Sequence, residues 1–199
     1  MRLDREARNY WRQQRRQMLR RNGRLGGGLS GGANLTKVLI GLMALAWIAE
    51  RFFPGPLYAI QADPAGAVLA YALDILSPGT FLSLALDSVF IWLVGSAIEP
   101  FSRWWQYLLV FFGSAVVAAV ILQHLTGGFP VSVSLATFGL AGAYVRVMMT
   151  RGIGGAARWA LTLLLINLVL SGFQAIAIIG LLSAFGSGFV IALLTQMDR

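Results

Sequence analysis

The chain has 199 residues, of which 57% are apolar and 12% charged, and its mean hydropathy is +0.71. These values exclude an ordinary soluble domain and indicate a polytopic membrane protein. A helical crossing needs about 20 apolar residues, so six spans nearly fill the chain after its polar N-terminus and leave no room for a second folded domain. The absence of cysteine excludes disulfides and thiol chemistry.

The net charge of +8 comes mainly from the N-terminus, where nine of the sixteen Lys and Arg residues lie within the first 24 positions. Because this segment directly precedes the apolar region, an anionic membrane surface or a partner's acidic face is favoured over nucleic acid. Helical spacing of its apolar residues predicts a basic amphipathic segment, 1–22, on the cytoplasmic leaflet; an unstructured tail is the alternative. The basic side chains expected at the membrane surface are Arg8, Arg12, Arg15, Arg16 and Arg20.

A Gly-rich linker, 23–34, leads into an all-α membrane domain, 35–195. The predicted spans are 35–53, 80–98, 104–125, 131–149, 157–171 and 175–194. Between the first two, the prolines and a short apolar piece, 65–71, predict a partly embedded loop with a short helix; an ordinary external loop is the alternative.

Charge predicts the topology of these spans. All of the sixteen Lys and Arg residues except Arg51 fall on one side of a six-span arrangement. The excess of positive charge in cytoplasmic loops then places both termini in the cytoplasm, in what we expect to be a bacterial plasma membrane.

Small and polar residues within the spans are candidates for packing and for function. Small-residue stripes allow close helix approach in the fourth and sixth spans, and the expected packing residues are Gly139, Gly142, Gly180, Ala184 and Gly188. Ser83 and Asp87 lie four residues apart and so share one helical face. No Lys or Arg is expected at the depth of Asp87, so we expect this side chain to be mainly neutral. It would then form a buried polar clamp with Ser83 and Ser134 that ties the second span to the fourth.

Two segments and the small-residue sixth span carry a family resemblance. The fourth span opens Ser132-Val133-Ser134-Leu135 and continues Ala136-Thr137-Phe138-Gly139-Leu140, and the second ends Val94-Gly95-Ser96-Ala97-Ile98-Glu99. These segments resemble the rhomboid intramembrane proteases, whose fourth helix opens Gly-x-Ser-Gly before Ala-x-Phe-Gly-Leu and whose second helix ends Gly-x-x-x-Glu. The resemblance covers about 35–194 and implies a six-helix rhomboid-like bundle.

The resemblance also implies that the catalytic machinery is lost. Ser134 takes the nucleophile position, but Ser132 and Leu135 replace the motif glycines, and Leu181 takes the position of the base histidine. Ser83 and Asp87 take the positions of a histidine and an asparagine that stabilise the oxyanion, and an ionised carboxylate would repel that charge. The implied function is that of a pseudoprotease, which binds transmembrane segments of other proteins without cleavage as an adaptor, chaperone or assembly subunit.

Two other functions remain open from the sequence. In an active serine protease, either His124, the only histidine, or Asp87 would have to act on Ser134 as an unconventional base. A small ion or solute carrier would use Asp87, because intramembrane carboxylates often mark ion paths. No metal or other cofactor is predicted, because one histidine, no cysteine and scattered carboxylates make no recognisable ligand set.

Overall fold

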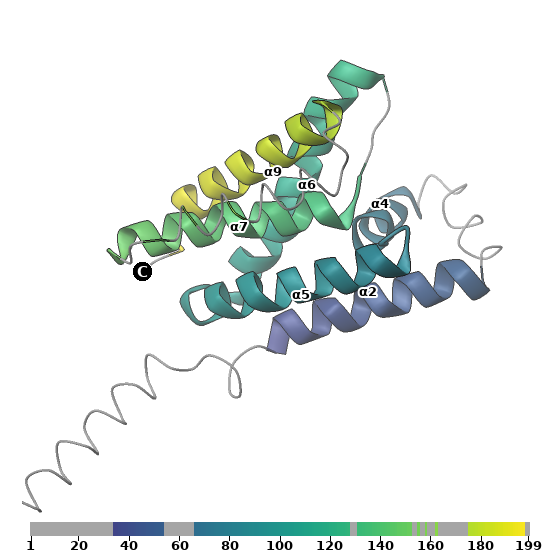
Figure 1. Ribbon diagram of the computed structural model, residues 1–199, viewed down its shortest axis with the longest axis horizontal. Coiled ribbons are helices and arrows are strands. Elements are labelled where there is room, and N and C mark those ends of the chain that lie inside the picture. The colour runs from purple at the N-terminus through teal and green to yellow at the C-terminus, as the bar shows by residue number, and fades with distance from the viewer. Residues whose placement is uncertain are drawn as a thin grey trace, which may run out of the picture.

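The computed structural model describes residues 34–53, 66–127, 131–152 and 175–197, together with positions 155, 158 and 162. Within this part the chain forms helices and no strand, which confirms the all-α prediction there (Figure 1). The helices are α2 (Asn34–Phe52), α4 (Ala67–Leu76), α5 (Phe81–Ile98), the 3-10 turn η2 (Glu99–Phe101), α6 (Trp104–Thr126), α7 (Val133–Thr150) and α9 (Ala175–Leu194).

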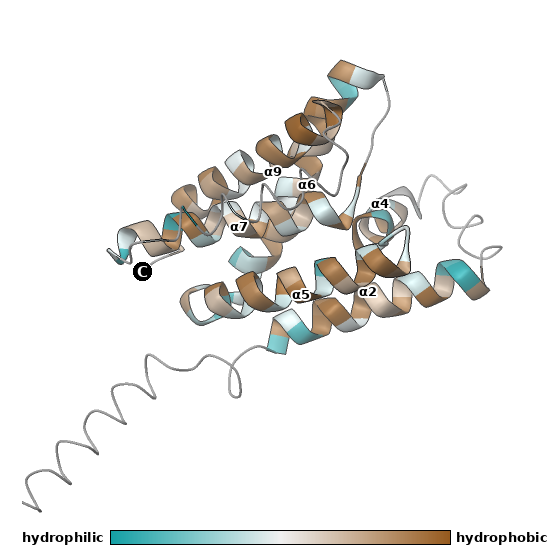
Figure 2. Ribbon diagram, in the orientation of Figure 1, coloured by the Kyte–Doolittle hydropathy of each residue, from teal (hydrophilic) through white to brown (hydrophobic). Residues whose placement is uncertain are grey.

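Four of these helical segments are long and apolar enough to cross a membrane: Phe81–Phe101, Trp104–Thr126, Val133–Thr150 and Ala175–Leu194 (Figure 2). The described residues are therefore compatible with an integral membrane protein. The 19-residue α2 is not among the four, because Lys37, Glu50 and Arg51 lie near its ends. The predicted fifth span, 157–171, falls outside the described residues except for positions 158 and 162, as do the segments 1–22 and 23–33. Six spans thus remain a prediction.

Local signals in the sequence explain where the apolar helices begin and end. Thr80 precedes α5, and its Oγ1 accepts a hydrogen bond from the Ser83 backbone N–H at 3.1 Å. The side chain of Gln106, in the first turn of α6, accepts from the backbone N–H of Arg103 at 2.8 Å. Gly127 ends α6 with φ of 72°, a left-handed conformation that glycine adopts without steric cost. These caps satisfy backbone groups that helix ends leave unpaired.

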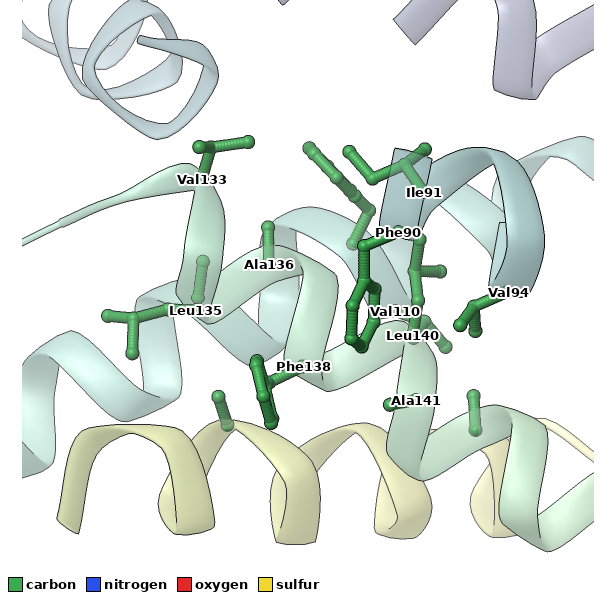
Figure 3. Packing of buried hydrophobic residues seen from close by; sticks show 14 of the residues in the cluster. Phe90, Ile91, Val94, Val110, Val133, Leu135, Ala136, Phe138, Leu140 and Ala141 are labelled. Atoms are coloured by element: carbon green, nitrogen blue, oxygen red, sulfur yellow. The ribbon is translucent and has the colours of Figure 1, made fainter. Parts of the chain in front are cut away.

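The helix α7 lies at the centre of the described bundle. In Figure 1 it runs between α5 and α9. Of its residues 72% are buried inside the protein, against 28–39% over the most apolar stretch of each of the other three membrane-length helices. Its buried residues come from all round the helix and pack against α5, α6 and α9 (Figure 3). A helix covered on every side is typical of the middle of a membrane bundle.

Glycines let α7 and α9 approach until their backbones touch. A Cβ added at Gly142 would collide with the backbone of Phe185, and one added at Gly188 would collide with the backbone of Gly139. A Cβ at Gly139 would also strike the side chain of Ser114 in α6. The structure thus places these three predicted packing residues where helices meet, as expected for small-residue interfaces in membranes.

The same contacts show that α7 and α9 are parallel. A Cβ at Gly180 would approach Leu135 at 3.3 Å and Leu122 of α6 at 2.9 Å, so the N-terminal parts of α7 and α9 lie together. Further along both helices, about two turns on α7 and about one and a half on α9, Gly142 faces Phe185. Ala184, the remaining predicted packing residue, is fully buried on the same face of α9.

Candidate functional site

Asp87 and Ser134 meet where α5 packs against α7. The Ser134 hydroxyl donates to both oxygens of the Asp87 carboxyl group, at 3.3 Å to each. Both distances exceed the usual value of about 2.7–2.8 Å for a hydroxyl donor, so one proton is shared weakly between two acceptors. Asp87 is 8% exposed. The pair is therefore a buried polar contact between two helices.

A stacked aromatic pair lies beside this polar contact. The rings of Phe90 and Phe138 are 5.3 Å apart, centroid to centroid, with 28° between their planes. In Figure 3, Phe90 projects from α5 toward α7. Because Asp87 faces Ser134 and Phe90 faces Phe138, α5 and α7 run in the same direction. The two contacts together form what we call the α5–α7 seam.

Ser83 does not join the predicted clamp. Its hydroxyl lies one turn before Asp87 but is 2.8 Å from Thr80 Oγ1, at the start of α5. The N-terminal turn of the helix thus uses this side chain for its own capping. Thr137 contributes on the other side of the seam, where its hydroxyl donates to the Ser134 carbonyl oxygen at 2.8 Å. Of the three residues expected in the clamp, the structure brings only Asp87 and Ser134 together.

His124 is placed as a helix-end residue. It is exposed near the C-terminus of α6, and its Nδ1 lies 2.9 Å from the carbonyl oxygen of Val120 in the same helix. The structure therefore does not pair it with Ser134. Leu181, at the position that the resemblance gives to the base, is a buried member of the apolar core. Neither position can take a proton from the Ser134 hydroxyl in this arrangement.

A second polar cluster, which we call the Glu99 node, was not predicted from the sequence. Glu99 accepts from the backbone N–H groups of Leu35 at 2.8 Å and Thr36 at 3.2 Å, and from the Thr36 hydroxyl at 2.7 Å. The Thr36 hydroxyl has one proton, which it gives to Glu99, so it accepts from the Tyr107 hydroxyl at 3.1 Å. The carboxylate caps the N-terminus of α2 from another helix.

The spacing of Gly95 and Glu99 was the signal available in the sequence. A Cβ at Gly95 would collide with the Tyr107 hydroxyl and would lie 3.1 Å from Thr36 Oγ1. Glycine at this position therefore makes room for the node, one turn before the carboxylate that anchors it. Leu35 and Thr36, which donate to Glu99, lie 64 and 63 residues before it along the chain, which is why spacing alone could not identify them.

Two further contacts lie at the same end of the bundle as the Glu99 node. The guanidinium of Arg151, after α7, lies 3.7 Å from the centroid of the Phe101 ring, a cation–π contact. The Gln106 side chain donates to the carbonyl oxygen of Thr195, after α9, at 2.7 Å. Polar contacts thus join all five long helices of the described part near this end.

In the part of the chain that the structure describes, no three His, Asp or Glu side chains are grouped so that they could hold a metal ion. Comparison of the sequence with protein families and with curated proteins finds no match. The rhomboid resemblance therefore rests on the motifs of this chain alone.

Substitutions at Asp87 test the clamp in the isolated protein. Asp87→Asn keeps an acceptor for the Ser134 hydroxyl and should change the free energy of unfolding in detergent by less than about 0.5 kcal/mol. Asp87→Leu should lower it by roughly 1–2 kcal/mol, because the buried hydroxyl then loses its acceptor. Thermal unfolding in mild detergent measures both, with Ser134→Ala as the companion variant. A larger loss for Asn than for Leu would contradict the neutral clamp and point to an ionised Asp87.

Proposed function

We propose that the protein is a rhomboid-like membrane protein without protease activity, which binds transmembrane segments of other membrane proteins as an adaptor, chaperone or assembly subunit. The hydrogen-bond partner of Ser134 is the observation that supports the loss of protease activity. A serine nucleophile needs a base to take its proton and donors to hold the oxyanion. Here the hydroxyl donates to a carboxyl group. We expect this group to be neutral, which makes it a poor base, and the resemblance places this same acid where the oxyanion would need a donor.

The placement of charge supports the proposed orientation. Lys37 in the first turn of α2, Arg103 before α6 and Arg151 after α7 all lie at the end that holds the Glu99 node. Arg51 lies at the opposite end, where Trp47 contacts Phe81 at the start of α5. The positive-inside rule makes the end with the Glu99 node cytoplasmic.

Helix direction supports a further crossing between α7 and α9. The two helices are parallel, so the end of α7 and the beginning of α9 lie at opposite ends of the bundle (Figure 1). Consecutive parallel spans require the chain between them to return through the membrane. This agrees with a fifth span in the predicted position and with both termini on the cytoplasmic side.

A fluorophosphonate probe tests the loss of catalysis. We expect no labelling of the full-length protein in native membranes, because nothing near Ser134 both activates the hydroxyl and stabilises an oxyanion. An active serine protease added to the same membranes is the positive control. Labelling that disappears in Ser134→Ala would overturn the proposal and favour an active enzyme with Asp87 as its base.

Photocrosslinking tests client binding. Leu86, 44% exposed and next to Asp87, and Leu45, 62% exposed on α2, are matched positions for a photoreactive amino acid. A client that enters beside α5 should crosslink at position 86 and much less at position 45. Equal crosslinking at both positions would indicate random encounters in the bilayer and would contradict a binding site.

A further inference from the structure

The helices α2 and α5 meet the closely packed α6, α7 and α9 at two places: at the α5–α7 seam and, at the other end of α5, around the Glu99 node, where Tyr107 of α6 and Arg151 after α7 take part. The helices α6, α7 and α9 pack through Ser114, Gly139, Gly142 and Gly188, where no space remains between helices. The helices α2 and α5 are antiparallel and are fastened to each other by the Glu99 node. Among the described residues, the seam near Asp87 has apolar packing, a ring stack and one weak polar contact.

The carboxyl group of Asp87 has unused acceptor capacity. An ionised carboxylate offers about four lone-pair sites, and among the described residues only the hydroxyls of Ser134 and Thr137 are placed to donate to Asp87. The Thr137 hydroxyl has a single proton and also donates to the Ser134 carbonyl oxygen at 2.8 Å, so it satisfies the carboxyl group only in part. A buried acid with so few donors can gain free energy by accepting another one.

The described part of the chain brings no cation to this acid. Beyond the basic N-terminal segment, its Lys and Arg residues are Lys37, Arg51, Arg103, Arg146, Arg151, Arg158 and Arg199. Arg51 is exposed at the end of α2, and Arg146 lies about 18 Å along α7 from Ser134 at 1.5 Å per residue. Asp87 makes no ion pair within the described residues.

Resting on the proposed function, we propose that Asp87 is the recognition site for a client transmembrane helix that carries a Lys or Arg inside the membrane. Asp87 lies six residues after Phe81, about 9 Å along α5, so the matching basic residue lies about two turns from the membrane face at which α5 begins. An intramembrane basic residue is costly without a partner. Asp87, which we expect to be neutral when it has no cation nearby, can ionise beside such a residue and balance its charge.

In this proposal, Ser134 is the hydrogen-bond donor that a client replaces. Without a client, its hydroxyl partly satisfies the Asp87 carboxyl group across the seam. A client ammonium or guanidinium group gives charge-assisted hydrogen bonds, which are about twice as strong as neutral ones. The client therefore replaces the weak Ser134 contact, and α5 exchanges part of its contact with α7 for a contact with the client.

The test uses the full-length protein in phosphatidylcholine vesicles with fluorescent polyleucine helices of about 20 residues. One helix carries Lys about seven residues from the end that aligns with the start of α5, a second carries Met there, and a third carries Lys about seven residues from the other end. Energy transfer reports association. The first helix should bind at least about tenfold more tightly than the other two, as expected for a buried charge pair.

Variants separate recognition from packing. Asp87→Asn should abolish the preference for Lys, whereas Ser134→Ala should keep or increase it because the carboxyl group is released. Glu50→Gln removes an exposed acid at the same end of the bundle and should change nothing. If the Lys and Met helices bind equally well, recognition by Asp87 is wrong while client binding stands; if no helix binds, both proposals fail. A Lys preference that survives Asp87→Asn also overturns the inference.

Discussion

Gly188→Ala should lower the stability of the protein by about 2 kcal/mol, because overpacking a filled interface typically costs about 1–3 kcal/mol. The added methyl group would meet the backbone of Gly139 rather than a side chain that could rotate away. The helices α7 and α9 must separate to accept it, and α7 is the central helix of the bundle. Thermal unfolding in mild detergent measures the loss.

Gly186→Ala is the matched control on the same helix. A Cβ at Gly186 would have no atom within 4 Å among the described residues, and alanine is the better helix former by about 1 kcal/mol. This variant should be as stable as the parent or slightly more so. Combining Gly188→Ala with Gly142→Ala should cost less than the sum of the two, because the first substitution already moves the helices apart. Equal effects at 186 and 188 would mean that the backbones do not touch.

Glu99→Ala should cost about 3 kcal/mol, because it removes three hydrogen bonds to a carboxylate and leaves their donors partly buried. Two of these donors are backbone N–H groups in the first turn of α2. The loss should therefore be local, and amide hydrogen exchange should speed up in α2 far more than in α7 or α9. Exchange that rises evenly through all helices would show that the Glu99 node does not hold α2 in particular.

Two variants that remove different numbers of hydrogen bonds test whether the loss of stability comes from the Glu99 node. Thr36→Val removes a hydroxyl that both donates to Glu99 and accepts from Tyr107, and should cost more than Tyr107→Phe, which removes one donor and about 1 kcal/mol. Glu50→Gln changes an exposed carboxylate on the same helix and should have no effect on exchange in α2.

The sequence predicted the helices well where apolar runs end at distinct signals. The sixth span was predicted at 175–194, which are the bounds of α9, and the second began at Thr80, which caps α5. A membrane helix satisfies its backbone within one segment, so its limits depend on local residues. The short apolar piece between the first two spans was also recognised, although α4 extends five residues beyond it.

The candidate site was predicted less completely. The pairing of Asp87 with Ser134 followed from placing an unpaired acid and a serine at similar depth in neighbouring helices. Ser83 was expected at the same contact because it shares a face with Asp87, but a cap three residues away was nearer to its hydroxyl. Whether the Ser83 hydroxyl bonds to Thr80 or to Asp87 depends on differences of a few ångströms in position. Helical periodicity shows which residues share a face but does not give such distances.

By itself, the sequence determined that this is an apolar, helical protein suited to a membrane, because composition and run length are properties of single segments. Tertiary structure alone decided which side chains meet across helices. Glu99 was visible only as the end of a motif, and its role as the cap of α2 depends on a residue 63 positions earlier. Such contacts depend on the rotation and depth of each helix against its neighbours, and these are set by packing at positions such as Gly139 and Gly188.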